Sequence, residues 1–238
     1  MENVGARPMI LRVIDLETTG FPPDAGIVEI GWCDVVKTPA SWLIGGPQAM
    51  LTDPQRLIEW QAMAIHHITD DDVSLEPPAS EVLPDVLAGG DVYVSHRASF
   101  ERAFIPDNGR PWICTWKVAI KFAPKAPGHS NQILRYWLKL DVNRDKALPP
   151  HRAGPDAYVT AHLLLRMLGK LTVEEMIEIT AQPAILPYFV FGKHAMQQIE
   201  TIPSGYLEWI IKQEQMDPDA QYTARHHLEQ RLKPRAAS

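Results

Sequence analysis

Two carboxylates stand two residues apart at the end of an apolar segment. Asp15 and Glu17 follow a run of apolar and β-branched residues in the segment MILRVIDLETTG, which spans Met9 to Gly20. Such a run predicts a buried strand, whose residues i and i+2 point to the same side. The repulsion between neighbouring carboxylates favours a divalent cation, because hard oxygen ligands suit Mg²⁺ or Mn²⁺. The alternative is a pair of solvated carboxylates at a strand end.

Two further carboxylates and a histidine, which could bind a metal ion or transfer a proton, lie at the ends of predicted helices and strands. Glu101 lies at the junction between a short predicted strand and a helix, and Asp156 lies in the first turn of another helix, directly after Pro155. His151 stands five residues before Asp156. The ordinary pKa of histidine, about 6.5, suits a general base near neutral pH. A plain surface or core histidine is the alternative.

The elements that would position these residues alternate along the chain. Strand patterns and helical patterns interleave, which predicts an α/β fold with a mixed sheet flanked by helices. After a linker at 183–187, a small module follows, with Tyr206, Leu207, Trp209 and Ile210 as its predicted core. The predicted strands lie at 10–17, 27–36, 41–44, 92–95 and 112–115, and the predicted helices at 53–64, 80–87, 116–122, 131–140 and 155–168.

Three segments together resemble the motifs of one enzyme family. Asp15-Leu16-Glu17-Thr18-Thr19-Gly20, Ser95-His96-Arg97-Ala98-Ser99-Phe100-Glu101 and His151-Arg152-Ala153-Gly154-Pro155-Asp156 resemble the motifs of the DEDDh branch of proofreading-type (DnaQ-like) 3′–5′ exonucleases. Gln61-Ala62-Met63-Ala64-Ile65-His66, Trp112-Ile113-Cys114-Thr115 and Phe191-Gly192-Lys193 are similar to the exodeoxyribonuclease X group within it. The resemblance implies an RNase H-like exonuclease domain at 1–182 and a small exodeoxyribonuclease X-like C-terminal module at 188–238.

The resemblance also implies a reaction and a role for each motif residue. The family hydrolyses DNA from the 3′ end to 5′-mononucleotides with two Mg²⁺ ions, for which Mn²⁺ can substitute. Asp15 would bridge both ions. Glu17 and Asp156 would support the ion beside the nucleophile, and Glu101 the ion beside the leaving group. His151 would be the general base.

Three more residues are expected to touch the substrate. By resemblance, Thr18, Phe21 and His66 would bind the 3′ end, with Phe21 stacked on or wedged against the terminal base. A hydrophobic plug for the turn is an equal alternative for Phe21, and a structural role at a helix end is an alternative for His66.

Two positions depart from the family pattern. Glu101 stands where the second motif normally has Asp, and Arg97 stands where it usually has Asn. The extra methylene moves the carboxylate by about 1 Å, which can cost about a hundredfold in rate. We expect a working exodeoxyribonuclease whose site has adapted. The alternatives are an RNA 3′-end trimming enzyme and a weakly active nucleic-acid-binding homologue.

Composition and charge limit where the protein is expected to be located and what it is expected to bind. The chain has 238 residues, 45% of them hydrophobic, a net charge of −6 and two cysteines. It lacks an apolar run of about 18 residues, and Met1 to Pro8 has no apolar signal-peptide core. We therefore expect a cytoplasmic protein. We expect it to associate with no membrane and to need no obligate protein partner. Its expected partner is DNA with a 3′ end, with RNA as the alternative. The charge argues against indiscriminate coating of nucleic acid.

Overall fold

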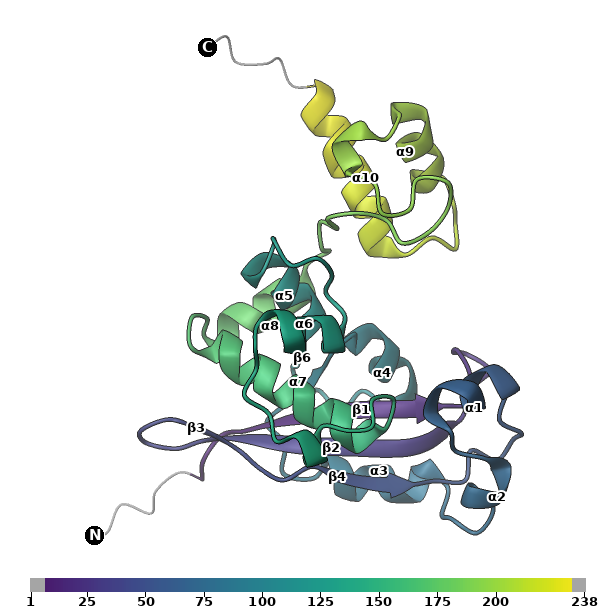
Figure 1. Ribbon diagram of the computed structural model, residues 1–238, viewed down its shortest axis with the longest axis vertical. Coiled ribbons are helices and arrows are strands. Elements are labelled where there is room, and N and C mark those ends of the chain that lie inside the picture. The colour runs from purple at the N-terminus through teal and green to yellow at the C-terminus, as the bar shows by residue number, and fades with distance from the viewer. Residues whose placement is uncertain (1–6, 233–238) are drawn as a thin grey trace.

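The sheet is mixed, as the sequence predicts. A computed structural model describes residues 7–232 (Figure 1). β1 (Ile10–Thr18) pairs antiparallel with β2 (Ile27–Lys37) and parallel with β5 (Val92–Ser95). The strand order is β3-β2-β1-β5-β6, with β4 also paired to β2. The other strands are β3 (Trp42–Ile44), β4 (Gln48–Leu51), which the sequence did not predict, and β6 (Trp112–Cys114).

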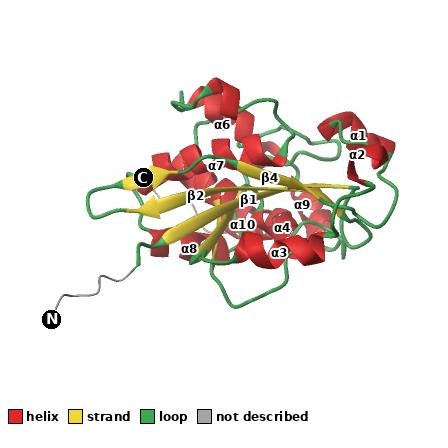
Figure 2. Ribbon diagram, turned by 90° about the horizontal axis from the view of Figure 1, so that it is seen from below, coloured by secondary structure: helices red, strands yellow, loops and turns green. Residues whose placement is uncertain are grey.

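Helices cover both faces of this sheet (Figure 2). One face packs on α5 (Thr115–Phe122), α6 (Asn131–Trp137), α7 (Ala153–Leu168) and α8 (Val173–Ala181). The opposite face packs on α3 (Ala79–Leu87) and α4 (Ala98–Phe104). The short helices α1 (Trp60–His66) and α2 (Asp70–Val73) lie beside the β1–β2 turn (Figure 1).

The alternation along β1 decides where its carboxylates go. Leu11 and Val13 are buried in the core beneath α7, whereas Ile14 and Leu16 are buried in the core beneath α3 and α4. Successive side chains of a strand point to opposite faces. Asp15 and Glu17 therefore continue the row of Leu11 and Val13 and face the side of the sheet that α7 covers.

A glycine allows α7 to approach this row closely. Gly31 of β2 pairs with Asp15 in the ladder, and a Cβ on Gly31 would lie 2.0 Å from the backbone carbon of Ala153. Only a residue without a side chain fits this contact. The first turn of α7 consequently lies directly over the end of β1, and that turn carries Asp156.

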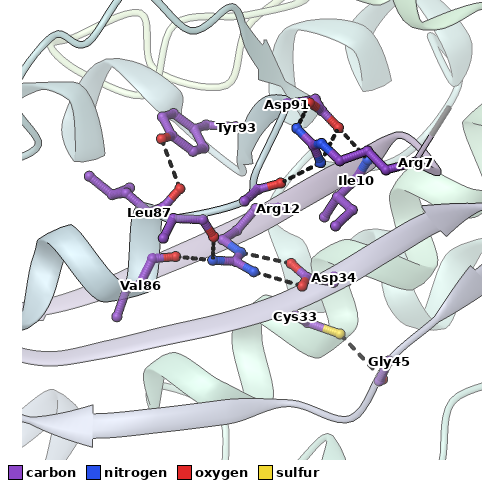
Figure 3. A network of polar contacts seen from close by, with 12 residues as sticks. Arg7, Ile10, Arg12, Cys33, Asp34, Gly45, Val86, Leu87, Asp91 and Tyr93 are labelled. Atoms are coloured by element: carbon purple, nitrogen blue, oxygen red, sulfur yellow. Dashed lines mark hydrogen bonds and ion pairs between the residues drawn. The ribbon is translucent and has the colours of Figure 1, made fainter.

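A polar network fixes the other face of β1 (Figure 3). The Arg12 guanidinium donates hydrogen bonds to both carboxylate oxygens of Asp34 on β2, each at 2.8 Å. It also donates to the carbonyls of Val86 and Ala88 at the end of α3. This buried network ties the two central strands to the segment that leads into β5. Its role is structural, because it lies on the face away from Asp15.

The predicted helix over 53–64 is wrong in its first half, since α1 begins only at Trp60. Pro54 is followed by Gln55 in the left-handed region at φ 56°, and the Asp53 carboxylate accepts a hydrogen bond from the Gln55 amide at 2.7 Å. This turn competes with helix formation. Ile58 is buried as an apolar pattern requires, but its amide donates to Asp70 rather than within a helix.

The C-terminal segment has a small core of its own. α9 (Ser204–Ile211) and α10 (Pro218–Leu232) pack together and stand apart from the sheet (Figure 1). Leu207 and Ile210 are fully buried as predicted, whereas Trp209 is 46% exposed and lies outside that core. Lys117 of α5 forms an ion pair with Asp219 of α10 at 3.1 Å. The boundaries 1–182 and 188–238 remain a prediction, and their outermost residues lie outside the described range.

Among residues 7–232, no helix combines the length and the apolar character needed to cross a bilayer.

Candidate active site

Three of the predicted metal ligands meet at the end of β1. Asp15 and Glu17 come from β1 and Asp156 from the first turn of α7, and one carboxylate oxygen of each lies within 4.8 Å of the others. The strand alternation and the close packing at Gly31 bring them together. Among the described residues, no lysine or arginine forms an ion pair with these three side chains.

The cluster is electrostatically strained without a cation. Burial, reinforced by the charges of Asp156 and Glu17, raises the pKa of Asp15 well above its ordinary value. Burial and the Asp156 charge raise the pKa of Glu17 to about 8. Burial also raises the pKa of Asp156, against the hydrogen bonds from His151 and Gln132 that lower it. Such shifts indicate carboxylates gathered for a ligand rather than for stability.

Glu101 is buried beside this cluster. It lies in the first turn of α4 with 5% of its surface exposed, and within residues 7–232 its Oε2 atom has no hydrogen-bond partner. Burial raises its pKa to about 8, and the charge of Glu17 acts in the same direction. Leaving a buried carboxylate oxygen without a partner is costly. This oxygen is therefore available to a ligand beside the cluster.

Neighbouring residues fix the orientation of Asp156. Its Oδ2 atom accepts a hydrogen bond from the His151 amide at 2.8 Å, and its Oδ1 atom accepts one from Gln132 Nε2 at 2.9 Å. Asn131 Nδ2 donates to the Asp156 carbonyl at 3.1 Å. His151 is exposed and has a left-handed backbone, with φ 59°. The structure therefore brings His151 to the edge of the cluster, as predicted.

An ion pair between Arg152, next to His151, and the buried Glu29 is not predicted by the sequence. Glu29 of β2 is 2% exposed and accepts hydrogen bonds from Arg152 Nε at 3.0 Å and from the Ala153 amide at 2.8 Å. Glu29 pairs with Glu17 in the ladder, and the Arg152 charge lowers the pKa of Glu17. The Glu29 charge raises the pKa of Glu17, so Arg152 offsets part of that repulsion, and the pair fixes the segment after His151. A charged residue inside the apolar run IVEI is the signal that would have found it.

The predicted substrate-binding residues line a pocket beside the cluster. Its volume is about 260 Å³, and it is lined by Glu17, Thr18, Phe21, His66 and Phe100 among others. Phe21 is 85% exposed and meets Phe100 edge to face, with 6.3 Å between ring centroids. It therefore does not act as a buried plug of its turn.

His66 and Thr18 are partly committed to local structure. His66 Nδ1 accepts a hydrogen bond from the Ile68 amide at 3.0 Å, which supports the helix-end alternative. Its Nε2 atom is buried and has no partner within residues 7–232, so one ring nitrogen is left for a ligand. The Thr18 hydroxyl donates to the Gly20 carbonyl at 2.7 Å, and its oxygen remains an acceptor.

The donor set fits hard divalent cations. The candidate ligands are four carboxylates, and Mg²⁺ and Mn²⁺ prefer oxygen donors of this type. The fit rests on the gathered oxygens, the raised pKa values and the unpartnered Oε2 of Glu101. Fold and site together define an α/β protein with a carboxylate cluster suited to a divalent cation beside a pocket.

Comparison with known proteins gives the family. The family model described as Exonuclease matches residues 13–164. The chain is 38% identical over 226 residues to Exodeoxyribonuclease 10 of Escherichia coli (strain K12), which covers 92% of this chain and 99% of that protein. The chain therefore belongs to the exonuclease family, and the predicted DEDDh resemblance is confirmed.

Solved structures agree with this assignment. The structure of Exonuclease X in complex with 5′ overhanging duplex DNA matches with a TM-score of 0.64 and 40% identity, over 72% of this chain and 99% of that chain. The nuclease domain of 3′hExo, a DEDDh family member bound to rAMP, matches with a TM-score of 0.54 and 20% identity, over 69% of this chain and 94% of that chain. The latter supports the RNase H-like fold alone.

Proposed function

We propose that this protein is a metal-dependent 3′–5′ exodeoxyribonuclease that releases 5′-mononucleotides. The observation that carries the proposal is the carboxylate cluster directly beside a pocket that shares Glu17 with it and is lined by the exposed ring of Phe21. The relative from Escherichia coli is named an exodeoxyribonuclease, and the structure of Exonuclease X was solved with DNA. A DNA 3′ end as partner and a cytoplasmic location belong to the same proposal.

The metal ligands are proposed residue by residue. Asp15, Glu17 and Asp156 would hold one Mg²⁺ ion, and Asp15 with Glu101 would hold a second, with Mn²⁺ as a substitute. Bound ions of this kind lower the pKa of water and neutralise charge on the reacting phosphate. The hydrogen bonds from Gln132 and His151 orient Asp156 for ligation, in the way that supporting contacts position metal ligands.

The other residues act on the proton and on the substrate. His151 takes the proton of the attacking water, as a general base next to the cluster. The buried Glu29–Arg152 pair holds the backbone after His151 in place. Phe21 packs against the terminal base, Thr18 and His66 line the same pocket, and together they hold the 3′ end while the scissile phosphate lies at the carboxylates.

The weakly active alternative is less well supported. A degenerate site would let Glu101 relax toward solvent or another partner. Instead Glu101 is 5% exposed beside the cluster with an oxygen left free for a ligand. This arrangement supports a site adapted to the longer side chain.

The test compares matched linear and circular single strands of DNA and RNA with Mg²⁺. The proposal predicts 5′-deoxymononucleotides from linear DNA, identified by mass, and no product from the circle. Cleavage of the circle would indicate an endonuclease. Faster digestion of linear RNA than of linear DNA would favour the RNA 3′-end trimming alternative. Tight binding without product from any strand would favour the binding homologue.

A further inference from the structure

A second and larger cavity lies between the sheet domain and the C-terminal module. It has a volume of about 450 Å³ and lies among residues of α5, of α6 and of the segment before α9. Its walls include Trp116 and Ile133 on one side and Tyr188, Phe191 and Met196 on the other. We call this cavity the interdomain cleft. Nothing in the proposed site uses it.

The chemistry of the interdomain cleft suits planar groups with attached negative charge. The Arg97 guanidinium lines it and lies 3.9 Å from the centre of the Trp116 ring. Within the described part of the chain, Arg97 forms no ion pair with a carboxylate. Aromatic rings and guanidinium planes stack on unpaired bases, and a free guanidinium binds phosphate.

Two other polar side chains of the interdomain cleft, His96 and Asp217, are hydrogen-bonded within the protein. Both ring nitrogens of His96 are hydrogen-bonded, to the Thr115 hydroxyl at 3.0 Å and the His129 carbonyl at 2.8 Å. The Asp217 carboxylate accepts hydrogen bonds from the Asp219 and Ala220 amides at the start of α10. His96 and Asp217 therefore form walls. The aromatic rings, Arg97 and the Oδ1 atom of Asn131, which has no hydrogen-bond partner within residues 7–232, are left for a ligand.

Hydrogen bonds connect the wall of the interdomain cleft to the carboxylate cluster. Asn131 lines it and donates to the Asp156 carbonyl, and the adjacent Gln132 donates to the Asp156 carboxylate. Arg97 stands four residues before Glu101, at the start of the same helix. The terminal-nucleotide pocket shares Phe100 of this helix and contains Glu17. The cluster thus shares Glu17 with the terminal-nucleotide pocket and is linked to the interdomain cleft through Asn131.

We propose that the interdomain cleft holds the single-stranded DNA immediately 5′ of the scissile phosphodiester. This inference rests on the proposed function and assigns the C-terminal module a role in binding substrate. Bases pack against Trp116, Tyr188 and Phe191, and Arg97 contacts the backbone. The volume lies in the range of about 300–1,000 Å³ that holds small organic ligands, so it suits unpaired nucleotides rather than a duplex.

The first arm of the test introduces charge at the mouth of the interdomain cleft. Val190 lines it and is 69% exposed, so its substitution leaves the core intact. In the full chain, Val190→Asp should raise the KM for a strand of about 20 nucleotides by about tenfold, and Val190→Lys should lower it. Both variants should leave kcat, and cleavage of a trinucleotide, unchanged. Tyr222→Ala, an exposed aromatic of α10 outside the cleft, is the matched control.

The second arm uses the unaltered protein in EDTA, so that it reports binding without cleavage. Single strands with 5-iodouracil at successive positions from the 3′ end are photocrosslinked, and the adducts are mapped by mass spectrometry. Adducts at Trp116, Tyr188 or Phe191 from positions 5′ of the last nucleotide are expected. Equal KM values for both Val190 variants, or adducts confined to other surfaces, would overturn the proposal and leave the cleft for a peptide or a small ligand. If the unaltered protein does not cleave the trinucleotide, the proposed function is wrong.

Discussion

Replacing Glu101 with glutamine should abolish the activity and stabilise the metal-free protein. The side chain is 5% exposed, and its Oε2 atom has no partner within residues 7–232. A neutral amide of the same shape removes the buried charge together with a proposed metal ligand. The Glu101 carboxylate would therefore lower the stability of the metal-free folded protein while it serves catalysis, as is common at active sites.

The size of the effect follows from the pKa of Glu101. Burial raises that pKa to about 8, above the ordinary value of about 4.3. Between these values the unfolded chain releases a proton that the folded chain keeps, so stability is present at low pH and is lost as pH rises. Each pH unit costs about 1.4 kcal/mol, which gives about 3 kcal/mol between about pH 5 and about pH 7. Glutamine cannot ionise and avoids this loss.

The assay is thermal unfolding in EDTA at about pH 5 and about pH 7. For a chain of this length, about 3 kcal/mol corresponds to a melting temperature higher by about 6–12 °C for Glu101→Gln at the upper pH, and to little difference at the lower. Glu178→Gln, on the exposed side of α8, is the control and should track the unaltered protein. If the melting temperatures of the unaltered protein and of Glu101→Gln change with pH in the same way, Glu101 does not have a raised pKa in the folded protein.

Three further substitutions test the positioning of the site. Gly31→Ala places a Cβ into the Ala153 backbone and should lower kcat by about a hundredfold while circular dichroism stays unchanged; an unaffected kcat would contradict the close packing of α7. Arg152→Ala leaves the buried Glu29 with only the hydrogen bond from the Ala153 amide and should cost about 1–3 kcal/mol in urea unfolding, and most of that loss should return in Arg152→Ala combined with Glu29→Gln. Additive losses in the double variant would argue against the pair. Phe21→Ala should raise the KM for single strands by about tenfold without changing the melting temperature, since its ring is 85% exposed; a destabilised variant would show that Phe21 is structural instead.

The sequence predicted the sheet because its signals are local. The apolar run of β1 predicted a strand, in which Asp15 and Glu17 point to one side, and Pro155 marked the first turn of α7. The false helix over 53–59 arose because a turn at Asp53 and Gln55 overrides an acceptable helical pattern. β4 was missed because its side chains are mostly exposed, which leaves its four residues without an apolar alternation.

Other features depend on contacts between distant segments. Gly31 is important only because Ala153 packs on it, and Glu29 only because Arg152 reaches it, across more than a hundred residues. The interdomain cleft likewise needs two parts of the chain to meet. No local pattern encodes such pairings, although a buried charge in a strand is a usable hint.

The most direct test of the account is digestion of a 5′-labelled DNA strand with Mg²⁺, with EDTA, and by Asp15→Ala. With Mg²⁺ we expect a ladder of labelled products that shortens stepwise from the 3′ end. We expect no such ladder with EDTA or with Asp15→Ala. Asp15→Ala should also lose the rise in melting temperature that Mg²⁺ gives the unaltered protein. A ladder that persists in EDTA or in Asp15→Ala would contradict the claim that these carboxylates hold the catalytic metal ions.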